Sequence, residues 1–105
     1  MKIVAVAACT IGITHTYMAQ EAIEQECKKR GYECKVETQG GMGIENELDE
    51  DEIAAADAVI LAIAIGIEGE ERFEEKEEEG KIIKIDPSVV IRDPAEIIDQ
   101  AEKLD

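Results

Sequence analysis

The sequence predicts an α/β fold in which an open, four-stranded parallel sheet carries helices on both faces. Short apolar runs lie at residues 3–8, 58–63 and 81–85, an alternating run lies at residues 32–37, and patterns with helical spacing separate these four predicted strands. Nearly continuous runs of β-branched and other apolar residues are typical of parallel strands that are buried on both faces. Right-handed crossovers between such strands place the helices on the two faces of the sheet. With 105 residues, the chain is predicted to form a single domain, residues 1–105.

The first half of the chain predicts two strands and one helix. Residues 3–8 are entirely apolar, so we expect a strand buried on both faces. Residues 16–30 have the spacing of a helix with one apolar face, and Gly31 supplies its stop. The inward-facing side chains are Ala19, Ala22, Ile23 and Cys27. Residues 32–37 alternate between apolar and polar side chains, which predicts an edge strand with one wetter face.

The second half continues the alternation of helices and strands. Residues 49–56 predict a short helix with an acidic first turn, and residues 58–63 predict the most buried strand. Residues 69–79 predict a polar helix, which is followed by a second edge strand at 81–85 whose lysines protect the edge. The last helix is expected over residues 93–104. It opens on an Asp-Pro-Ala-Glu sequence, which supplies an N-cap, a proline at the first helical position and a capping-box glutamate.

Chemistry is expected in the loop after the first strand, because open parallel sheets bind ligands at the carboxyl ends of strands near the switch in strand order. This loop runs from Cys9 to the start of the first helix. Unpaired amides and the helix dipole there stabilise a thiolate and any anion bonded to it, so Cys9 is a candidate nucleophile. Gly12 permits close backbone approach. The hydroxyls available to an oxyanion belong to Thr10, Thr14 and Thr16. The alternative is that Cys9 is a small buried hydrophobic residue.

The loop has no fixed full positive charge, since neither Lys nor Arg occurs between Lys2 and Lys28. A cysteine phosphatase of the C-x5-R type needs an arginine six residues after its cysteine to hold the oxygens of the transition state. His15 occupies that position here. The sequence therefore favours a site that accepts a phosphoryl group and passes it on. His15 is a candidate hydrogen-bond donor to that group; a locally bonded residue at the helix start is the alternative.

The loop resembles the active-site motif C-P-[TS]-G-x-A-H-T-Y-M-A of the fructose-family enzyme IIB domains of the bacterial phosphoenolpyruvate-dependent sugar phosphotransferase system. Blocks similar to the same family follow in order at residues 36–40, 43–48, 53–57 and 71–73, so that the resemblance covers nearly the whole chain. It implies four parallel strands in the order 2-1-3-4. It also implies that Cys9 takes phosphate from a phosphohistidine on a IIA partner and gives it to fructose or a related sugar at a membrane IIC partner.

The motif and the sheet topology together define the expected site. The residues expected to surround a phosphate on Cys9 are Thr10, Ile11, Gly12, Ile13, Thr14, His15 and Thr16. Gln39 and Gly40 follow the second predicted strand and should lie at the same end of the sheet, where they are candidate contacts for phosphate or a partner protein. Met42, between glycines, is a candidate apolar contact. For Gln39 and Gly40 the alternative is ordinary loop structure, and for Met42 it is a side chain that simply fills a gap in the packing.

Two alternative functions stay open at this point. A small cysteine-dependent phosphatase is disfavoured by the missing arginine. A catalytically silent variant of the fold, natural or designed, is compatible with four departures from the family's usual residues. These departures are Thr10, Ile11, Thr14 and Ala64.

Charge and composition disfavour several other partners. The net charge of −15 repels nucleic acid and anionic lipid. Residues 1–44 sum to zero, whereas residues 45–57 carry −7 and residues 68–79 carry −6, so the expected site lies in the neutral part of the chain. No apolar run reaches the roughly 18 to 20 residues that a membrane span requires. No nucleotide or zinc motif occurs, so no cofactor or metal is expected. Three cysteines without a C-x-x-C pair fit a reduced, cytoplasmic chain.

Overall fold

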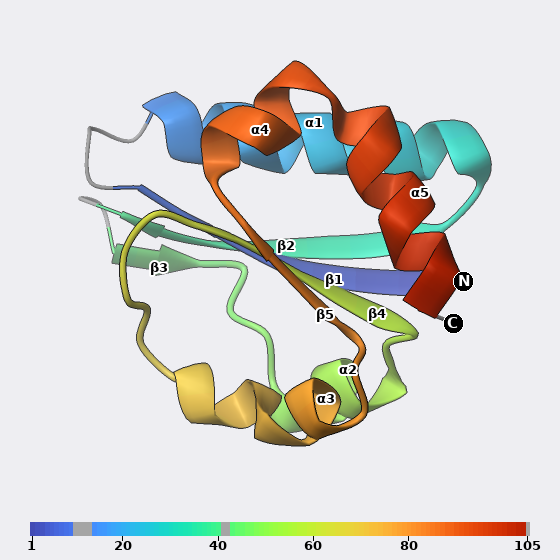
Figure 1. The fold of residues 1–105 in the computed structure, drawn as a ribbon. Helices are drawn as coiled ribbons and strands as arrows, with labels where there is room; N and C mark the ends of the chain where they lie inside the picture. Colours follow the sequence, from blue (N-terminus) through green and yellow to red (C-terminus); the bar gives the residue numbers. More distant parts are fainter. Residues whose placement is uncertain (10–13, 41–42, 105) are drawn as a thin grey trace.

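The computed structural model describes residues 1–9, 14–40 and 43–104, and a five-stranded mixed sheet lies at its centre (Figure 1). The strands are β1 (Lys2–Ala8), β2 (Glu33–Gly40), β3 (Gly43–Glu45), β4 (Ala58–Ile63) and β5 (Ile82–Ile85). They lie side by side in the order β3-β2-β1-β4-β5. β1 pairs in parallel with β2 and β4, and β4 pairs in parallel with β5. The carboxyl ends of the four parallel strands β1, β2, β4 and β5 therefore lie at the same end of the sheet, which we call its carboxyl edge.

The prediction of an α/β fold is confirmed, but the prediction of a purely parallel, four-stranded sheet in the order 2-1-3-4 is wrong. β3 is a fifth strand that runs antiparallel to the end of β2, with Gly40 opposite Gly43. All three of its residues are exposed, and a strand this short shows no hydrophobic period. β2 also continues to Gly40, beyond the predicted end at residue 37, because Thr38 and Gln39 pair with β1 on one side and β3 on the other.

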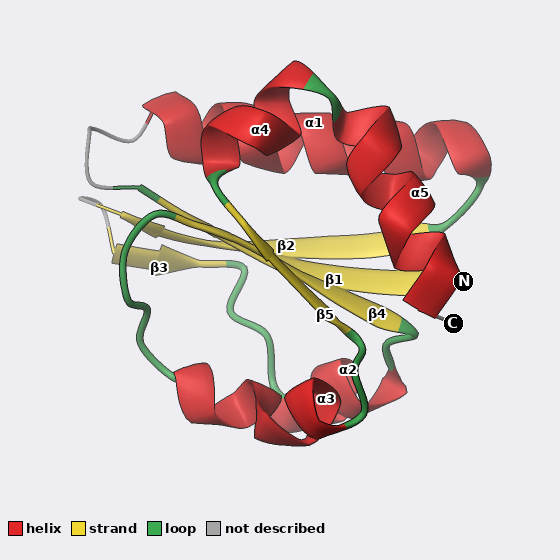
Figure 2. Cartoon of the chain, viewed as in Figure 1, coloured by secondary structure: helices red, strands yellow, loops and turns green. Residues whose placement is uncertain are grey.

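Helices cover both faces of the sheet, as predicted (Figure 2). One layer contains α1 (Thr14–Arg30), α4 (Pro87–Arg92) and α5 (Pro94–Leu104), and the other contains α2 (Glu50–Ala55), the 3-10 helix η1 (Glu70–Phe73) and α3 (Glu74–Glu78). α1 begins two residues before its predicted start and ends where Gly31 adopts a positive φ of 76°. None of the helices in the described ranges is both long and apolar enough to cross a membrane.

Two regions of the helical layers differ from the prediction. The polar helix expected at residues 69–79 is divided into η1 and α3, because Phe73, with φ −100° and ψ 2°, leaves the α-helical path between them. α4 is a helix that the sequence analysis missed. Asp86 caps its amino terminus and Pro87 follows at the first helical position. Six residues make fewer than two helical turns, so α4 shows no hydrophobic period in the sequence.

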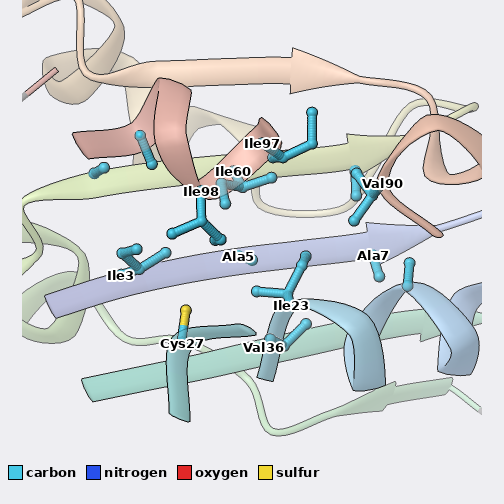
Figure 3. Packing of buried hydrophobic residues seen from close by; sticks show 14 residues of the cluster. Ile3, Ala5, Ala7, Ile23, Cys27, Val36, Ile60, Val90, Ile97 and Ile98 are labelled. Atoms are coloured by element: carbon cyan, nitrogen blue, oxygen red, sulfur yellow. The ribbon is translucent and has the colours of Figure 1, made fainter. Parts of the chain in front are cut away.

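Two hydrophobic cores, one on each face, hold the central strands. Alternate residues of a strand point to opposite faces. On the α1 side, Ala5, Val36 and Ile60 pack with Ile23 of α1 (Figure 3), and on the α2 side the intervening strand residues pack with Phe73. Every residue of β4 is buried, as expected of the most buried strand, and β5 lies at a sheet edge, as predicted. The carboxyl end of β1 is therefore a firmly packed support for the loop that follows it.

Candidate functional site

Cys9 directly follows the central strand β1 and is partly exposed. The residue before it, Ala8, is paired with Gln39 of β2 on one side and with Ile63 of β4 on the other. The backbone N–H of Ala64 donates to the carbonyl oxygen of Ala8 at 3.1 Å. The thiol thus follows the middle strand of the sheet, where the carboxyl ends of β1, β2 and β4 lie side by side.

The amino terminus of α1 lies at the same edge (Figure 1). Unpaired amide N–H groups and the dipole of this 17-residue helix favour an anion there. Thr14 and His15 are exposed in the first turn, whereas Thr16 is only 1% exposed. Its Oγ1 atom has no hydrogen-bond partner among the residues that the structure describes. Since a buried hydroxyl without a partner is costly, Thr16 Oγ1 is a candidate ligand for a group bound at this helix end.

Part of the predicted site lies outside the described residues. The residues concerned are Thr10, Ile11, Gly12, Ile13 and Met42. Their roles therefore stay predictions. In the described ranges no group of three or more His, Cys, Asp or Glu side chains is arranged to hold a metal ion.

Tyr17 links the first turns of α1 to the outermost strand. Its hydroxyl donates to Oε1 of Glu45 on β3, and this bond is the main reason that the pKa of Tyr17 is raised. Glu45 is the first residue of the acidic segment 45–57 and so lies beside the start of α1. Most of this segment and of segment 68–79 forms the layer of α2, η1 and α3, on the face opposite α1 (Figure 1). Most of the negative charge is therefore separated by the sheet from the α1 side.

The turn between β5 and α4 also borders the carboxyl edge, which the sequence analysis did not anticipate. Asp86 accepts hydrogen bonds from Ser88 Oγ at 2.6 Å and from the Ser88 N–H at 2.8 Å. These two bonds, in that order of importance, lower the pKa of Asp86, and the charge of nearby His15 acts in the same direction. The Asp86-Pro87 dipeptide was a signal for this helix start, because Asp is a favoured N-cap and Pro a favoured first residue.

Gln39 is buried, and its side-chain amide bonds within the protein. Nε2 donates to Oε2 of Glu37 at 2.6 Å and to the carbonyl oxygen of Glu68 at 2.9 Å. Oε1 accepts from the N–H of Glu68 at 2.8 Å. These bonds hold the segment after β4 against β2. Gly40, the next residue, is exposed and paired with Gly43. The contacts of Gln39 and Gly40 with phosphate or a partner stay predictions.

A buried ion pair beside Gln39 received no role in the sequence analysis. Nη1 and Nη2 of Arg72 donate to Oε1 and Oε2 of Glu37 at 2.8 and 3.0 Å, and the Leu48 N–H donates to Oε1 at 2.8 Å. Burial by itself raises the pKa of Glu37, but the bonds from Arg72, Leu48 and Gln39 together hold it below its ordinary value. The signal in the sequence was a glutamate next to Val36, inside a strand, together with a rare cation in the acidic segment 68–79.

The other two thiols lie at the opposite end of the sheet. Cys34 pairs with Ile3, near the start of β1. Cys27 is fully buried on α1, and Cys34 packs against the same core. A hydrogen bond to Cys27, followed by burial, raises the pKa of the Cys34 thiol. Among the three cysteines, Cys9 is therefore the one that combines exposure with a place at the carboxyl edge.

Within residues 1–9, 14–40 and 43–104, three large apolar side chains are exposed near the carboxyl edge, and we call them the apolar rim. They are Met18 on α1, Ile44 on β3 and Ile65 after β4, with exposed fractions of 45%, 36% and 39%. Ile44 is paired with Gln39, which is itself paired with Ala8, and Ile65 follows the end of β4 by two residues. These exposed apolar side chains are candidate contacts for another protein.

Comparison with known proteins defines the class to which this fold and this edge belong. Residues 4–100 match the family described as the "PTS system, Lactose/Cellobiose specific IIB subunit". The chain therefore belongs to the IIB family of the sugar phosphotransferase system (PTS), a family of phosphotransferase domains. The family resemblance that the sequence predicted is confirmed.

The individual relatives carry fructose-like or fructose-specific names. The chain is 58% identical over 72 residues, 69% of this chain and 68% of the other, to the PTS system fructose-like EIIB component 2 of Escherichia coli (strain K12). It is 53% identical over 72 residues to the fructose-like PTS system EIIBC component of the same organism, covering 69% of this chain and 15% of that one. A crystal structure of a domain from the fructose-specific IIABC component of Borrelia burgdorferi is 48% identical, with a TM-score of 0.84, and the match covers 95% of this chain and 91% of that domain.

Proposed function

We propose that this IIB domain is a phosphoryl carrier. In this proposal Cys9 accepts phosphate from a phosphohistidine on a IIA protein and passes it to fructose or a related sugar held by a membrane IIC protein. The observation that carries the proposal is the position of Cys9, a partly exposed thiol at the carboxyl end of the central strand, at the edge where α1 begins. Membership of the PTS IIB family supports the reaction class, and the fructose-like names of the relatives support the sugar class.

The transfer runs in two displacements. In the first, the Cys9 thiolate attacks phosphorus opposite the P–N bond of the donor. The S–P bond forms as the P–N bond breaks, and the electron pair of that bond returns to the imidazole nitrogen of the donor histidine. In the second, a sugar hydroxyl attacks the phosphocysteine. The O–P bond forms, the S–P bond breaks, the hydroxyl proton passes to a base or to water, and the thiolate is restored.

Neutral hydrogen-bond donors stabilise the negative charge of the phosphocysteine in this proposal. The N–H groups at the start of α1 favour an anion, and Thr16 Oγ1 supplies a buried hydroxyl. His15 is in the exposed first turn of the same helix. No Lys or Arg occurs between Lys2 and Lys28. An arginine clamp would stabilise the bound phosphate more strongly than these neutral donors do. The weaker set of donors suits a carrier, because a carrier must pass its phosphate on.

The apolar rim supports docking of two proteins in turn. Met18, Ile44 and Ile65 surround the edge that the donor and the acceptor must both reach. The EIIBC relative, whose name combines the two components, supports a IIC protein as the acceptor partner. The proposed place of action is accordingly the cytoplasmic side of the membrane, where the rim contacts IIA and IIC successively.

Intact-mass spectrometry tests the phosphorylation of Cys9. The protein is incubated with a phosphorylated IIA protein of a fructose-like system, and we expect the mass to rise by one phosphate. Cys9→Ser should abolish the acid-labile adduct, whereas the matched control Cys34→Ser, at the opposite end of the sheet, should retain it. A folded wild-type protein that takes up no phosphate from a competent donor would overturn the proposal. Hydrolysis of an aryl phosphate without any donor would indicate a phosphatase instead.

A further inference from the structure

A network of buried polar side chains lies directly behind the carboxyl edge and connects three segments that are distant in the sequence. Gln39 binds both the N–H and the carbonyl oxygen of Glu68, at 2.8 and 2.9 Å. Glu37 anchors Gln39 at 2.6 Å and is in turn held by Arg72. Arg72 also donates to the carbonyl oxygens of Leu48, Glu68 and Gly69. One connected set of side chains thus fixes β2, the segment before α2 and the segment after β4.

This network fixes the carboxyl-terminal end of the segment 64–68, whose amino-terminal end is bonded to β1 next to Cys9. Residues 64–68 leave β4 at the carboxyl edge. At the near end, the N–H of Ala64 bonds to the carbonyl oxygen of Ala8, the residue before Cys9. At the far end, the backbone of Glu68 bonds to Gln39, which is itself paired with Ala8 in the sheet. The segment is therefore bonded at one end to Ala8, the residue before Cys9, and at the other end to Gln39, the sheet partner of Ala8. Ile65 of the apolar rim lies between these two ends.

A buried ion pair adds little net stability to a fold. The free energy lost when two charges leave water is about as large as the free energy gained from their attraction, and apolar side chains of similar size stabilise a fold as well or better. Glu37 is fully buried and Gln39 nearly so, yet both are polar and each has several bonds. Directional bonds can fix the position of a backbone segment, whereas apolar contacts in the same place would leave it free to slide.

We propose that Gln39, held in place by Glu37 and Arg72, is a positioning residue for phosphotransfer. It fixes residues 64–68 as one wall of the Cys9 site, so that Ile65 meets the phosphorylated donor protein in the productive orientation. The proposal rests on the phosphoryl-carrier function proposed above, and it assigns to Gln39 a role through the backbone of Glu68, not through contact with phosphate.

Gln39→Leu tests the proposal, because leucine has a similar volume and no amide. We expect amide hydrogen exchange at residues 64–68 to become faster while exchange in β1 and β4 is unchanged. The second-order rate constant for phosphate transfer from a phosphorylated IIA protein to Cys9 should fall about tenfold or more, since a small misplacement of a positioning element has effects of this size. The fall should appear mainly as a higher KM for the donor, and alkylation of Cys9 by iodoacetamide should keep its wild-type rate.

Two controls separate positioning from stability. Gln100→Leu makes the same chemical change on α5, where the side-chain amide of Gln100 donates to Glu96, and Ile98→Val weakens the core on the α1 side. Both should transfer phosphate at the wild-type rate. If Gln39→Leu does not fold, Glu68→Pro removes the backbone N–H that donates to Gln39 Oε1, together with the exposed Glu68 side chain, and should raise the KM in the same way. Wild-type transfer kinetics in folded Gln39→Leu or Glu68→Pro would overturn the proposal, whereas absence of phosphate transfer to the wild-type protein would overturn the carrier function itself.

Discussion

The carboxylate of Glu37 has no exposed surface, yet it meets the guanidinium of Arg72 through two hydrogen bonds of 2.8 and 3.0 Å. Bidentate pairs of this kind are geometrically specific. Because Glu37 lies on β2 and Arg72 on η1, the pair fixes the acidic helical layer against the sheet at one defined position. Arg72 also packs over the ring of Phe73, 5.2 Å from its centroid, so the same side chain contributes to the apolar core.

Removing one partner of this pair is expected to be far more damaging than replacing both. Arg72→Ala leaves a buried carboxylate without a counter-charge and should lower the free energy of unfolding by about 3–5 kcal/mol. Glu37→Leu combined with Arg72→Met fills the same space with apolar groups and should recover most of this loss. Urea denaturation of the three proteins measures the difference.

An exposed ion pair provides the matched control for the buried one: Nζ of Lys84 lies 3.6 Å from Oε1 of Glu70. Lys84→Ala should change the free energy of unfolding by less than about 1 kcal/mol, because solvent screens surface ion pairs. The expectation is that the ion pair adds little net stability to the fold. A double variant at Glu37 and Arg72 that is no more stable than Arg72→Ala would contradict this expectation, since it would mean that the network stabilises the fold through its charges.

Stability is expected to depend on pH through Glu37. Its pKa in the folded protein lies below the ordinary value of 4.5, so in acid the unfolded chain binds a proton at Glu37 before the folded protein does. The contribution of Glu37 is therefore fully present above about pH 4.5 and is lost as the pH falls through the lower, folded pKa. Urea denaturation at several pH values below about 5 should show a steeper loss of stability in the wild type than in Glu37→Gln. Glu78→Gln, an exposed glutamate of α3, should follow the wild-type slope.

The three thiols are expected to react in a fixed order. Cys9 is partly exposed, Cys27 has no exposed surface, and the pKa of Cys34 is raised by its bond to Cys27 and by burial. Since the thiolate is the reactive form, limiting iodoacetamide should modify Cys9 first, as peptide mapping by mass spectrometry can show. Phosphorylation of Cys9 should protect it. Rapid labelling of Cys34 in the folded Cys9→Ser variant would contradict this order.

The parts of the fold that the sequence revealed are those with a strong hydrophobic pattern. Residues 58–63 are apolar throughout and form β4 with the predicted bounds. β3 and α4 were missed because they are short: the side chains of β3 are all exposed, and only the Asp86-Pro87 dipeptide marks the start of α4. A strand that binds its neighbour only through backbone bonds has no pattern in its side chains.

The candidate site was predictable to the extent that it follows from chain order. A buried strand followed by a cysteine and a helix start places Cys9 at the carboxyl edge without knowledge of any other contact. The network around Gln39 could not be found in this way. Glu37 and Gln39 on β2 are distant in the chain from Glu68 and Arg72, and only the folded structure shows that the two pairs meet. The sequence showed Gln39 at the right edge but not the backbone that it binds.

Thr16 provides a test in which stability and activity should change in opposite directions. Its buried Oγ1 has no partner among the described residues, so Thr16→Val, which has nearly the same shape, should keep or raise the free energy of unfolding. If Oγ1 donates to the phosphate on Cys9, the same variant should phosphorylate about tenfold more slowly, the effect of losing one hydrogen bond of about 1.4 kcal/mol. Thr16→Ser keeps the hydroxyl and should retain most of the rate. Thermal denaturation and transfer kinetics of the three proteins decide the matter. A stable Thr16→Val with the wild-type rate would show that the hydroxyl does not serve the phosphoryl group.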